Sequence, residues 1–125
     1  MKPKKMSFDV SPEAMAEFEK KMKDPGIFTF DEKGFTVALD NGPLSIRWEE
    51  IDRLVGYKKD QYATDLICLD VEYRGMSFTI HEETAGWFVF LDRTKAAFPG
   101  IHKNWEAEIA LPVFATNLTV LYVRS

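Results

Sequence analysis

The sequence predicts one α+β domain of 125 residues, in which a helix caps a strongly bent antiparallel sheet or partly open barrel. Stretches of alternating apolar and polar residues follow one another in pairs, separated by short turns that contain glycine. Other segments repeat apolar residues every three or four positions, which is the spacing of one helix face. No internal repeat, low-complexity segment or linker divides the chain, so we expect residues 1–125 to form a single domain.

The first predicted element is a helix that precedes the sheet. It begins at residues 11–12, where a serine cap is followed by a proline in the first helical position, and it stops at the Asp-Pro-Gly turn of residues 24–26. One narrow apolar stripe runs along this otherwise charged helix, made up of Met15, Phe18 and Met22. Because the stripe is too small to hold the helix alone, we expect the helix to dock on the body of the protein or on a partner.

A hairpin is predicted next, over residues 27–39. Its turn ends in Gly34, which we expect to supply the positive φ that such a turn needs. A second turn at residues 40–43 leads into a short strand over residues 44–47, where apolar and polar side chains alternate. These segments begin the predicted sheet.

A corner is predicted where this strand ends. Trp48 and Ile51 are three residues apart and lie on one face of a helical turn, while the acidic residues around them face water. Alternation resumes over residues 54–57 and ends in the charged residues 58–60. We therefore expect a single helical turn to join two strands and to insert Trp48 and Ile51 under the edge of the sheet.

The rest of the chain predicts a second hairpin, the capping helix and a C-terminal extension. The hairpin pairs residues 66–73 with 76–81, and its better core face is Ile67, Leu69, Val71 and Tyr73. The capping helix spans about residues 85–98, and the face that we expect to plug the sheet is Trp87, Phe90, Leu91, Thr94, Ala97 and Phe98. A short helix capped by Asn104 and an apolar strand over residues 117–125 complete the extension.

Charge and hydropathy argue against two classes of function. The formal net charge is −4, and residues 65–92 hold six acidic residues against one arginine, a field that repels nucleic-acid phosphates and anionic lipid heads. No apolar run approaches the roughly 18 residues needed to span a bilayer, and the basic start lacks the apolar stretch of a signal peptide. We therefore expect a cytoplasmic protein that binds no nucleic acid.

The single cysteine, Cys68, lies in the apolar run LICL. One cysteine excludes an intramolecular disulfide. A nucleophilic thiolate is favoured by positive surroundings, whereas this segment is acidic. Cys68 is therefore predicted to be a small buried core residue.

The order of strands, the strand-WxxI-strand corner, the second hairpin and the capping helix resemble a bacterial pleckstrin-homology-like or GRAM-like domain over residues 27–98. The resemblance implies a sheet bent into a partly open barrel and plugged at one end by the helix over residues 85–98. The chain departs from that pattern by its N-terminal helix and its C-terminal extension. It also lacks the basic strand-loop cluster with which lipid-binding members hold phosphoinositides, so a lipid function is not implied.

His81, Glu82 and Glu83 are the candidates for acid–base or metal chemistry, because they stand together where a strand runs into a helix. Consecutive strand residues point to opposite faces, so His81 and Glu82 are not expected to converge. No second ligand follows at a spacing typical of zinc sites. We therefore predict no catalytic residue, metal or cofactor, and interpret these residues as a strand end and as acidic residues that favour the following helix N-terminus.

The candidates for partner contact are Phe88, Val89, Tyr57 and Tyr62. Phe88 and Val89 fall outside the predicted plugging face, where a solvated helix should be polar. Either a terminal segment of the same chain covers them, or a second copy or a partner does. Tyr57 and Tyr62 flank a cationic segment that is predicted to be an exposed loop, and tyrosine is frequent at protein contacts.

Two functional hypotheses follow. The first is a non-enzymatic binding or interaction protein in a bacterial-type cytoplasm, such as an immunity or regulatory protein that masks a protein partner. The small size, acidity and 14% aromatic content of the chain fit this class. The alternative is a small-ligand enzyme or ligand carrier with a pocket near His81 and Glu83. A deep pocket that holds His81 with a perturbed carboxylate would favour the alternative, and a closed core with an exposed aromatic patch would favour the first.

Overall fold

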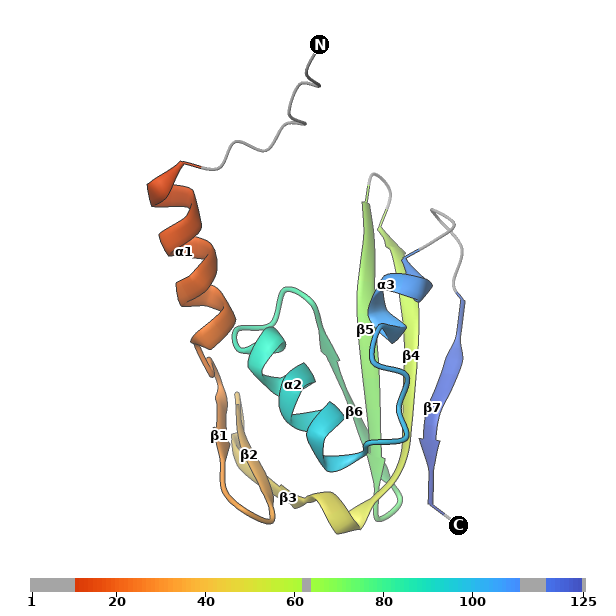
Figure 1. Cartoon of the computed structure of the whole chain (residues 1–125). Helices are drawn as coiled ribbons and strands as arrows, with labels where there is room; N and C mark the ends of the chain where they lie inside the picture. Colours follow the sequence, from red (N-terminus) through yellow and green to blue (C-terminus); the bar gives the residue numbers. More distant parts are fainter. Residues whose placement is uncertain (1–10, 62–63, 111–116, 125) are drawn as a thin grey trace.

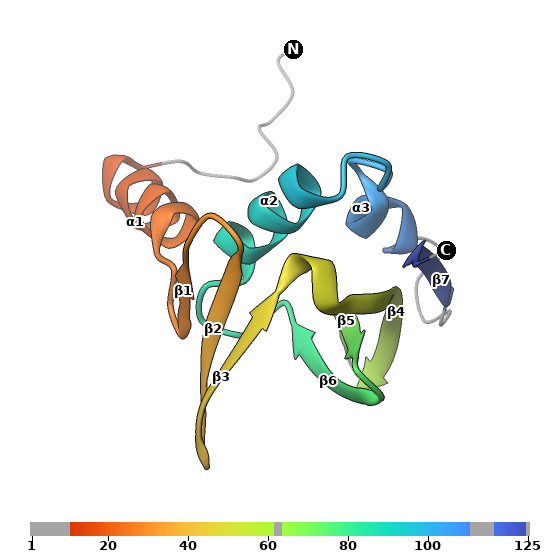
Figure 2. The same ribbon diagram turned by 90° about the horizontal axis from the view of Figure 1, so that it is seen from below.

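The structure, a computed structural model, describes residues 11–61, 64–110 and 117–124. Within these residues the chain forms two antiparallel sheets and three α-helices, which confirms the predicted α+β class. The sheets lie on either side of the central helix α2 (Trp87–Ala97) in Figure 1, and Figure 2 shows α2 and α3 (Trp105–Ile109) covering the same side of both sheets. In the described part of the chain the two sheets do not join into a closed barrel.

The first sheet has the strand order β1-β2-β3, with bounds Phe28–Phe30, Gly34–Leu39 and Gly42–Arg47. The predicted hairpin and the strand after it are therefore confirmed. Alternate side chains of these strands point into the core and are buried, namely Phe28, Phe35, Val37 and Ile46.

The predicted role of Gly34 is wrong. Gly34 lies in β2 and has no positive φ. A Cβ at this position would lie 2.0 Å from the carbonyl oxygen of Ile46, so glycine is needed for the close approach of β3. The turn itself is closed by Asp31, whose Oδ1 accepts hydrogen bonds from the backbone N–H groups of Lys33 at 2.8 Å and Gly34 at 2.9 Å.

The predicted corner is a 3₁₀ turn, η1 (Trp48–Glu50), that leads into strand β4 (Ile51–Gln61). Ile51 is fully buried and Trp48 is half-buried. The Trp48 ring centroid lies 5.0 Å from that of Phe35 and 6.3 Å from that of Phe90, so this side chain joins the first sheet to α2.

The second sheet has the order β6-β5-β4-β7, where β5 is Thr64–Tyr73, β6 is Met76–His81 and β7 is Thr119–Val123. These bounds confirm the second hairpin and the C-terminal strand. On β5, the predicted core face is buried or half-buried, but Leu66 and Cys68 on the opposite face are buried as well.

Strand β4 is longer than the sequence predicts. The charged residues 58–60 were expected to end it in an exposed loop, yet β4 continues to Gln61. The Lys58 side chain is only 1% exposed, and its Nζ donates to the carbonyl oxygen of Ala110 at 2.8 Å and lies 3.5 Å from Asp65 Oδ2. A buried ammonium group needs such partners, and they explain how a lysine fits inside the sheet.

Helix α2 plugs the space between the sheets with the face that the sequence predicts. Its core residue Phe90 is fully buried, with ring centroids 4.7 Å from Phe28 and 5.1 Å from Phe35. Helix α3 packs on β4 at Gly56, where a Cβ would lie 2.6 Å from the Trp105 ring. The core is thus an aromatic cluster centred on Phe90.

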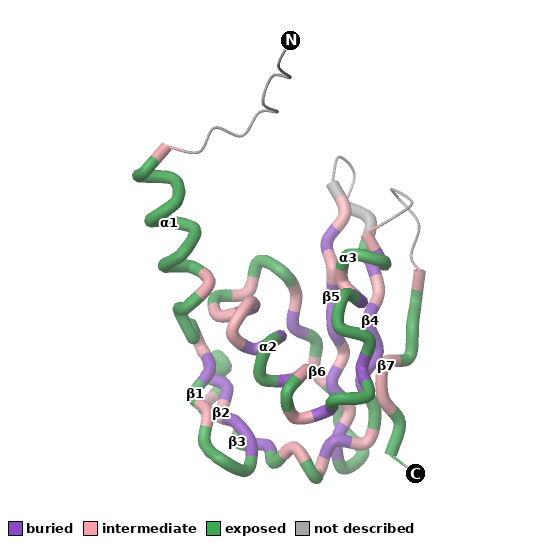
Figure 3. The backbone as a smooth tube through the Cα atoms, viewed as in Figure 1, coloured by how far each residue is buried: buried purple, intermediate pink, exposed green. Residues whose placement is uncertain are grey.

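Helix α1 (Pro12–Lys23) lies outside this core. None of its residues is buried, and Figure 3 shows it as a mainly exposed arm beside α2. No helix among the described residues is long and apolar enough to cross a membrane.

Candidate functional site

The base of α1 is fixed where the chain passes the start of α2. The Ile27 N–H donates to the carbonyl oxygen of Ala85 at 3.2 Å. Gly26 and Gly86 both have positive φ. A Cβ on Gly26 would lie 2.1 Å from the Ala85 carbonyl carbon, and a Cβ on Gly86 would lie 2.1 Å from the Pro25 carbonyl oxygen. The sequence assigns Gly26 only to a turn and gives Gly86 no role, but together these glycines allow two backbone segments to touch and thereby position α1 beside α2.

An apolar surface follows from this placement. It consists of Met15, Phe18 and Met22 on α1 with Phe88 on α2, and we call it the helix-pair surface. The Phe18 and Phe88 rings meet edge to face, with centroids 6.3 Å apart and an interplanar angle of 64°. The N-terminal helix therefore covers part of Phe88, while the next residue, Val89, is half-buried.

The helix-pair surface remains open to solvent. Phe18 is 53% exposed and Met15 is 45% exposed, although both belong to the single apolar stripe of α1. A 12-residue helix is marginally stable in water without packing, and α1 buries none of its residues. The described part of the chain thus leaves the stripe of α1 only partly covered.

Two hollows adjoin this surface. One, of about 340 Å³, lies between the end of α1 and the loop before α2 and is lined by Lys21, Asp24, Glu82, Glu83, Thr84, Ala85, Gly86, Trp87 and Phe88. The other, of about 410 Å³, runs along α1 and is lined by Glu17, Phe18, Lys20, Lys21 and Asp24. The apolar centre is therefore bordered by acidic and basic side chains.

The three candidates for chemistry do not share one site. His81 Nδ1 accepts a hydrogen bond from the Glu83 backbone N–H at 3.2 Å, and Glu82 Oε1 accepts one from the Ile67 N–H at 2.9 Å. Glu82 and Glu83 line the smaller hollow, whereas His81 does not. Among the described residues no group of three or more His, Cys, Asp or Glu side chains could hold a metal ion. The observed contacts of His81 and Glu82 brace the loop that leads into α2.

Tyr57 lies away from the helix-pair surface. It belongs to β4, and its hydroxyl donates to Asp70 Oδ1 at 3.1 Å, which also accepts from the Thr79 hydroxyl at 2.6 Å. Burial raises the pKa of Tyr57, so this group stays a neutral donor. Tyr62 lies outside the described residues. Phe88 and Val89 thus lie on α2, where both are half-buried, whereas Tyr57 lies on β4.

Cys68 is buried, as the sequence predicts. Its Sγ lies 3.6 Å from the carbonyl oxygen of Leu66, to which the thiol donates. Burial raises the pKa of the Cys68 thiol, which disfavours the thiolate needed for nucleophilic chemistry.

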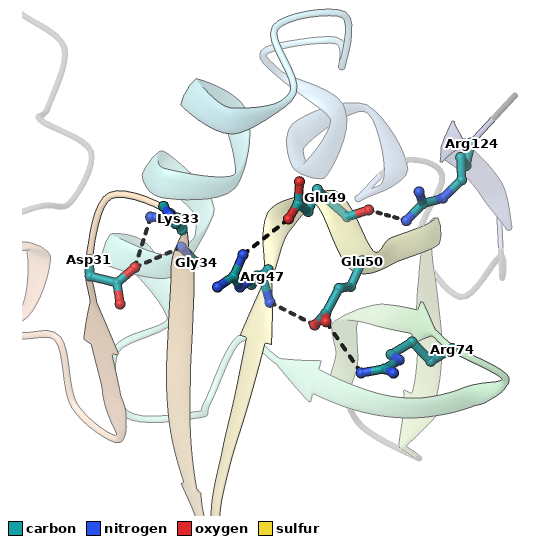
Figure 4. A network of polar contacts seen from close by, with 8 residues as sticks. All are labelled: Asp31, Lys33, Gly34, Arg47, Glu49, Glu50, Arg74 and Arg124. Atoms are coloured by element: carbon teal, nitrogen blue, oxygen red, sulfur yellow. Dashed lines mark hydrogen bonds and ion pairs between the residues drawn. The ribbon is translucent and has the colours of Figure 1, made fainter.

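A polar network surrounds the corner at η1 and is drawn in Figure 4. Arg47 pairs with Glu49 at 3.3 Å, and Arg74 pairs with Glu50 at the same distance. A hollow of about 240 Å³ lies here, but these ion pairs already offset the arginine charges. The network ties the first sheet to the second, and Arg124 extends it by donating to the Glu49 carbonyl oxygen.

Comparisons with known proteins add no family to this description. No family model, curated protein or solved structure matches the chain significantly. Function therefore has to be argued from the geometry of the helix-pair surface.

Proposed function

We propose that the chain is a non-enzymatic binding protein that docks its helix-pair surface on a protein partner and masks that partner, as an immunity or regulatory protein does. The observation that carries the proposal is the exposure of Phe18 and Met15 on a helix that buries none of its residues. Exposed apolar side chains that gather on one element and are rimmed by charges are typical of protein contacts.

Burial of Phe18 and Met15 alone does not provide enough free energy for a stable complex. Burying a Phe or Met side chain completely stabilises a complex by about 1.5–3 kcal/mol, and roughly half of each side chain is still exposed. Covering both therefore contributes about 2 kcal/mol, which is less than the cost of association, at least about 4 kcal/mol. The partner must accordingly contact the two charged hollows beside the stripe as well.

The body that presents this surface is, in our proposal, a barrel-like scaffold of the pleckstrin-homology-like or GRAM-like type. Its support is the pair of antiparallel sheets joined by the Trp48 corner and plugged by α2. The scaffold holds α2 rigidly through Phe90 and leaves α1 on the outside. We propose no lipid-binding role for it.

The second candidate function is binding of a small ligand in the hollow beside Glu82 and Glu83. Its volume of about 340 Å³ is sufficient for a small molecule. However, the Glu82 carboxylate accepts the Ile67 N–H, and His81 does not line the hollow. The contact function is favoured because apolar side chains of the helix-pair surface are left exposed by the described residues of the chain.

The test is site-specific photo-crosslinking in cells that express the chain. A photoreactive amino acid replaces Phe18 in one variant and Glu13 in a matched control. At 100° per residue, Glu13 points away from the apolar stripe on the same exposed helix, and it lines neither hollow. A protein adduct from position 18 that is absent from position 13, and is lost with Met15→Glu, is the expected result. Absence of any adduct at position 18, or equal adducts at both positions, would refute the proposal.

A further inference from the structure

We propose that Asn41 is a site of spontaneous covalent modification, at which its side-chain amide converts to a carboxylate by way of a succinimide. Asn41 and Asp40 form the two-residue loop between β2 and β3, closed by the pair Leu39 and Gly42. Asn41 is exposed, and a glycine follows it. This proposal concerns the opposite end of the first sheet from its corner and is independent of the helix-pair surface.

Gly42 has no side chain that could hinder attack by its own backbone nitrogen. Its φ is 122°, and a Cβ built at this position would meet nothing within 4 Å. Any other residue type would place a side chain beside the nitrogen and would be strained at this φ. The residue that must attack the Asn41 side chain is therefore the one with the least steric hindrance.

The Asn41 amide is also free to move. Among the described residues it has no hydrogen-bond partner, whereas the Asn117 amide Nδ2 donates to the Ile109 carbonyl oxygen at 3.2 Å. Asn117 is followed by Leu118 and Asn104 by Trp105, so both attacking nitrogens carry bulky neighbours. The chain thus contains two internal controls for Asn41.

The reaction balances with water alone. The Gly42 nitrogen loses its proton and attacks Cγ of Asn41, a new N–Cγ bond forms, the Cγ–Nδ2 bond breaks, and ammonia leaves with a proton. Water then opens the five-membered ring at either carbonyl and gives aspartate or isoaspartate at position 41. One neutral amide becomes one carboxylate, so the formal net charge changes from −4 to −5.

The products alter the tip of the first sheet. The new charge lies directly beside Asp40, and like charges in adjacent positions repel one another. Isoaspartate also adds a methylene to the main chain within a loop of two residues, where loop length fixes the strand register. We therefore expect the modification to loosen the pairing of Leu39 with Gly42.

The experiment is incubation of the purified full chain at neutral and mildly alkaline pH, followed by peptide mapping with mass spectrometry. The expected result is loss of the amide at Asn41 alone, with an aspartate and an isoaspartate peptide, at a rate that rises with pH. A more acidic species of the intact protein should accumulate at the same rate as the Asn41 amide is lost. The Asn41→Gln variant should not form this species, because its longer side chain disfavours the five-membered ring.

Two results would overturn the proposal. One is an amide at Asn41 that persists as long as those of Asn104 and Asn117 under the same conditions. The other is accumulation of the same acidic species in the Asn41→Gln variant.

Discussion

Replacing Phe90 by alanine should be among the most destabilising changes in α2. Phe90 is fully buried, and its ring lies between those of Phe28, Phe35 and Trp48, with centroids 4.7, 5.1 and 6.3 Å away. Three rigid rings cannot collapse into the space that is left, so the cavity and the lost transfer energy together should cost about 3–5 kcal/mol. For a domain of this size that corresponds to a fall in Tm of roughly 10–20 °C.

Phe88→Ala is the matched control on the same helix. Phe88 is half-buried, and its aromatic contact is with Phe18 of α1, so the expected loss is about 1 kcal/mol. Urea unfolding followed by tryptophan fluorescence gives both free energies. Equal losses from Phe88→Ala and Phe90→Ala would show that the core is not centred on Phe90 and would refute the assignment of the two faces of α2.

Two further predictions concern the corner and the thiol. Trp48→Ala should lower the free energy of unfolding by about 3 kcal/mol, whereas Glu49→Ala on the exposed side should change it by less than about 0.5 kcal/mol. Equal effects in urea unfolding would contradict the packing of Trp48 at the corner. Cys68 should resist alkylation at neutral pH until the chain is unfolded, because burial raises the pKa of its thiol; rapid labelling of the native protein by iodoacetamide would contradict this.

Much of the fold could be predicted because periodicity and core packing agree. The alternation on β5 identifies Leu69 and Val71 as core residues, and the helical spacing on α2 identifies Phe90 and Leu91. The Trp48 corner follows from an apolar pair at a helical spacing between two strands. In each case a single local rule and the tertiary structure favour the same residues.

Other features depend on contacts that no local pattern contains. The charge of Lys58 indicates a loop in the sequence. Lys58 nevertheless lies in a strand, because the fold brings Ala110 and Asp65 to its ammonium group. Gly34 serves a close approach of β3 and not a turn, which only the paired backbone reveals. A turn with positive φ and a close approach of two strands look alike in sequence, because both require a residue without a Cβ.

The candidate site was predictable only in part. The stripe that contains Met15 and Phe18 indicates a docking helix, and the apolar residue Phe88 indicates a contact, but the sequence does not show that the two meet. Their meeting depends on the crossing of the backbone at Gly26 and Gly86, which lie 60 positions apart in the chain. Long-range backbone contacts of this kind leave no periodic signal.

Amide hydrogen exchange of α1 in the purified chain tests the central claim, that the described residues cover this helix only in part and that a partner covers the rest. Because α1 buries none of its residues, its amides should exchange much faster in dilute solution than those of β4 and β5. Protection of α1 equal to that of β4 and β5 at every dilution would contradict the account, since the chain would then stabilise α1 without a partner.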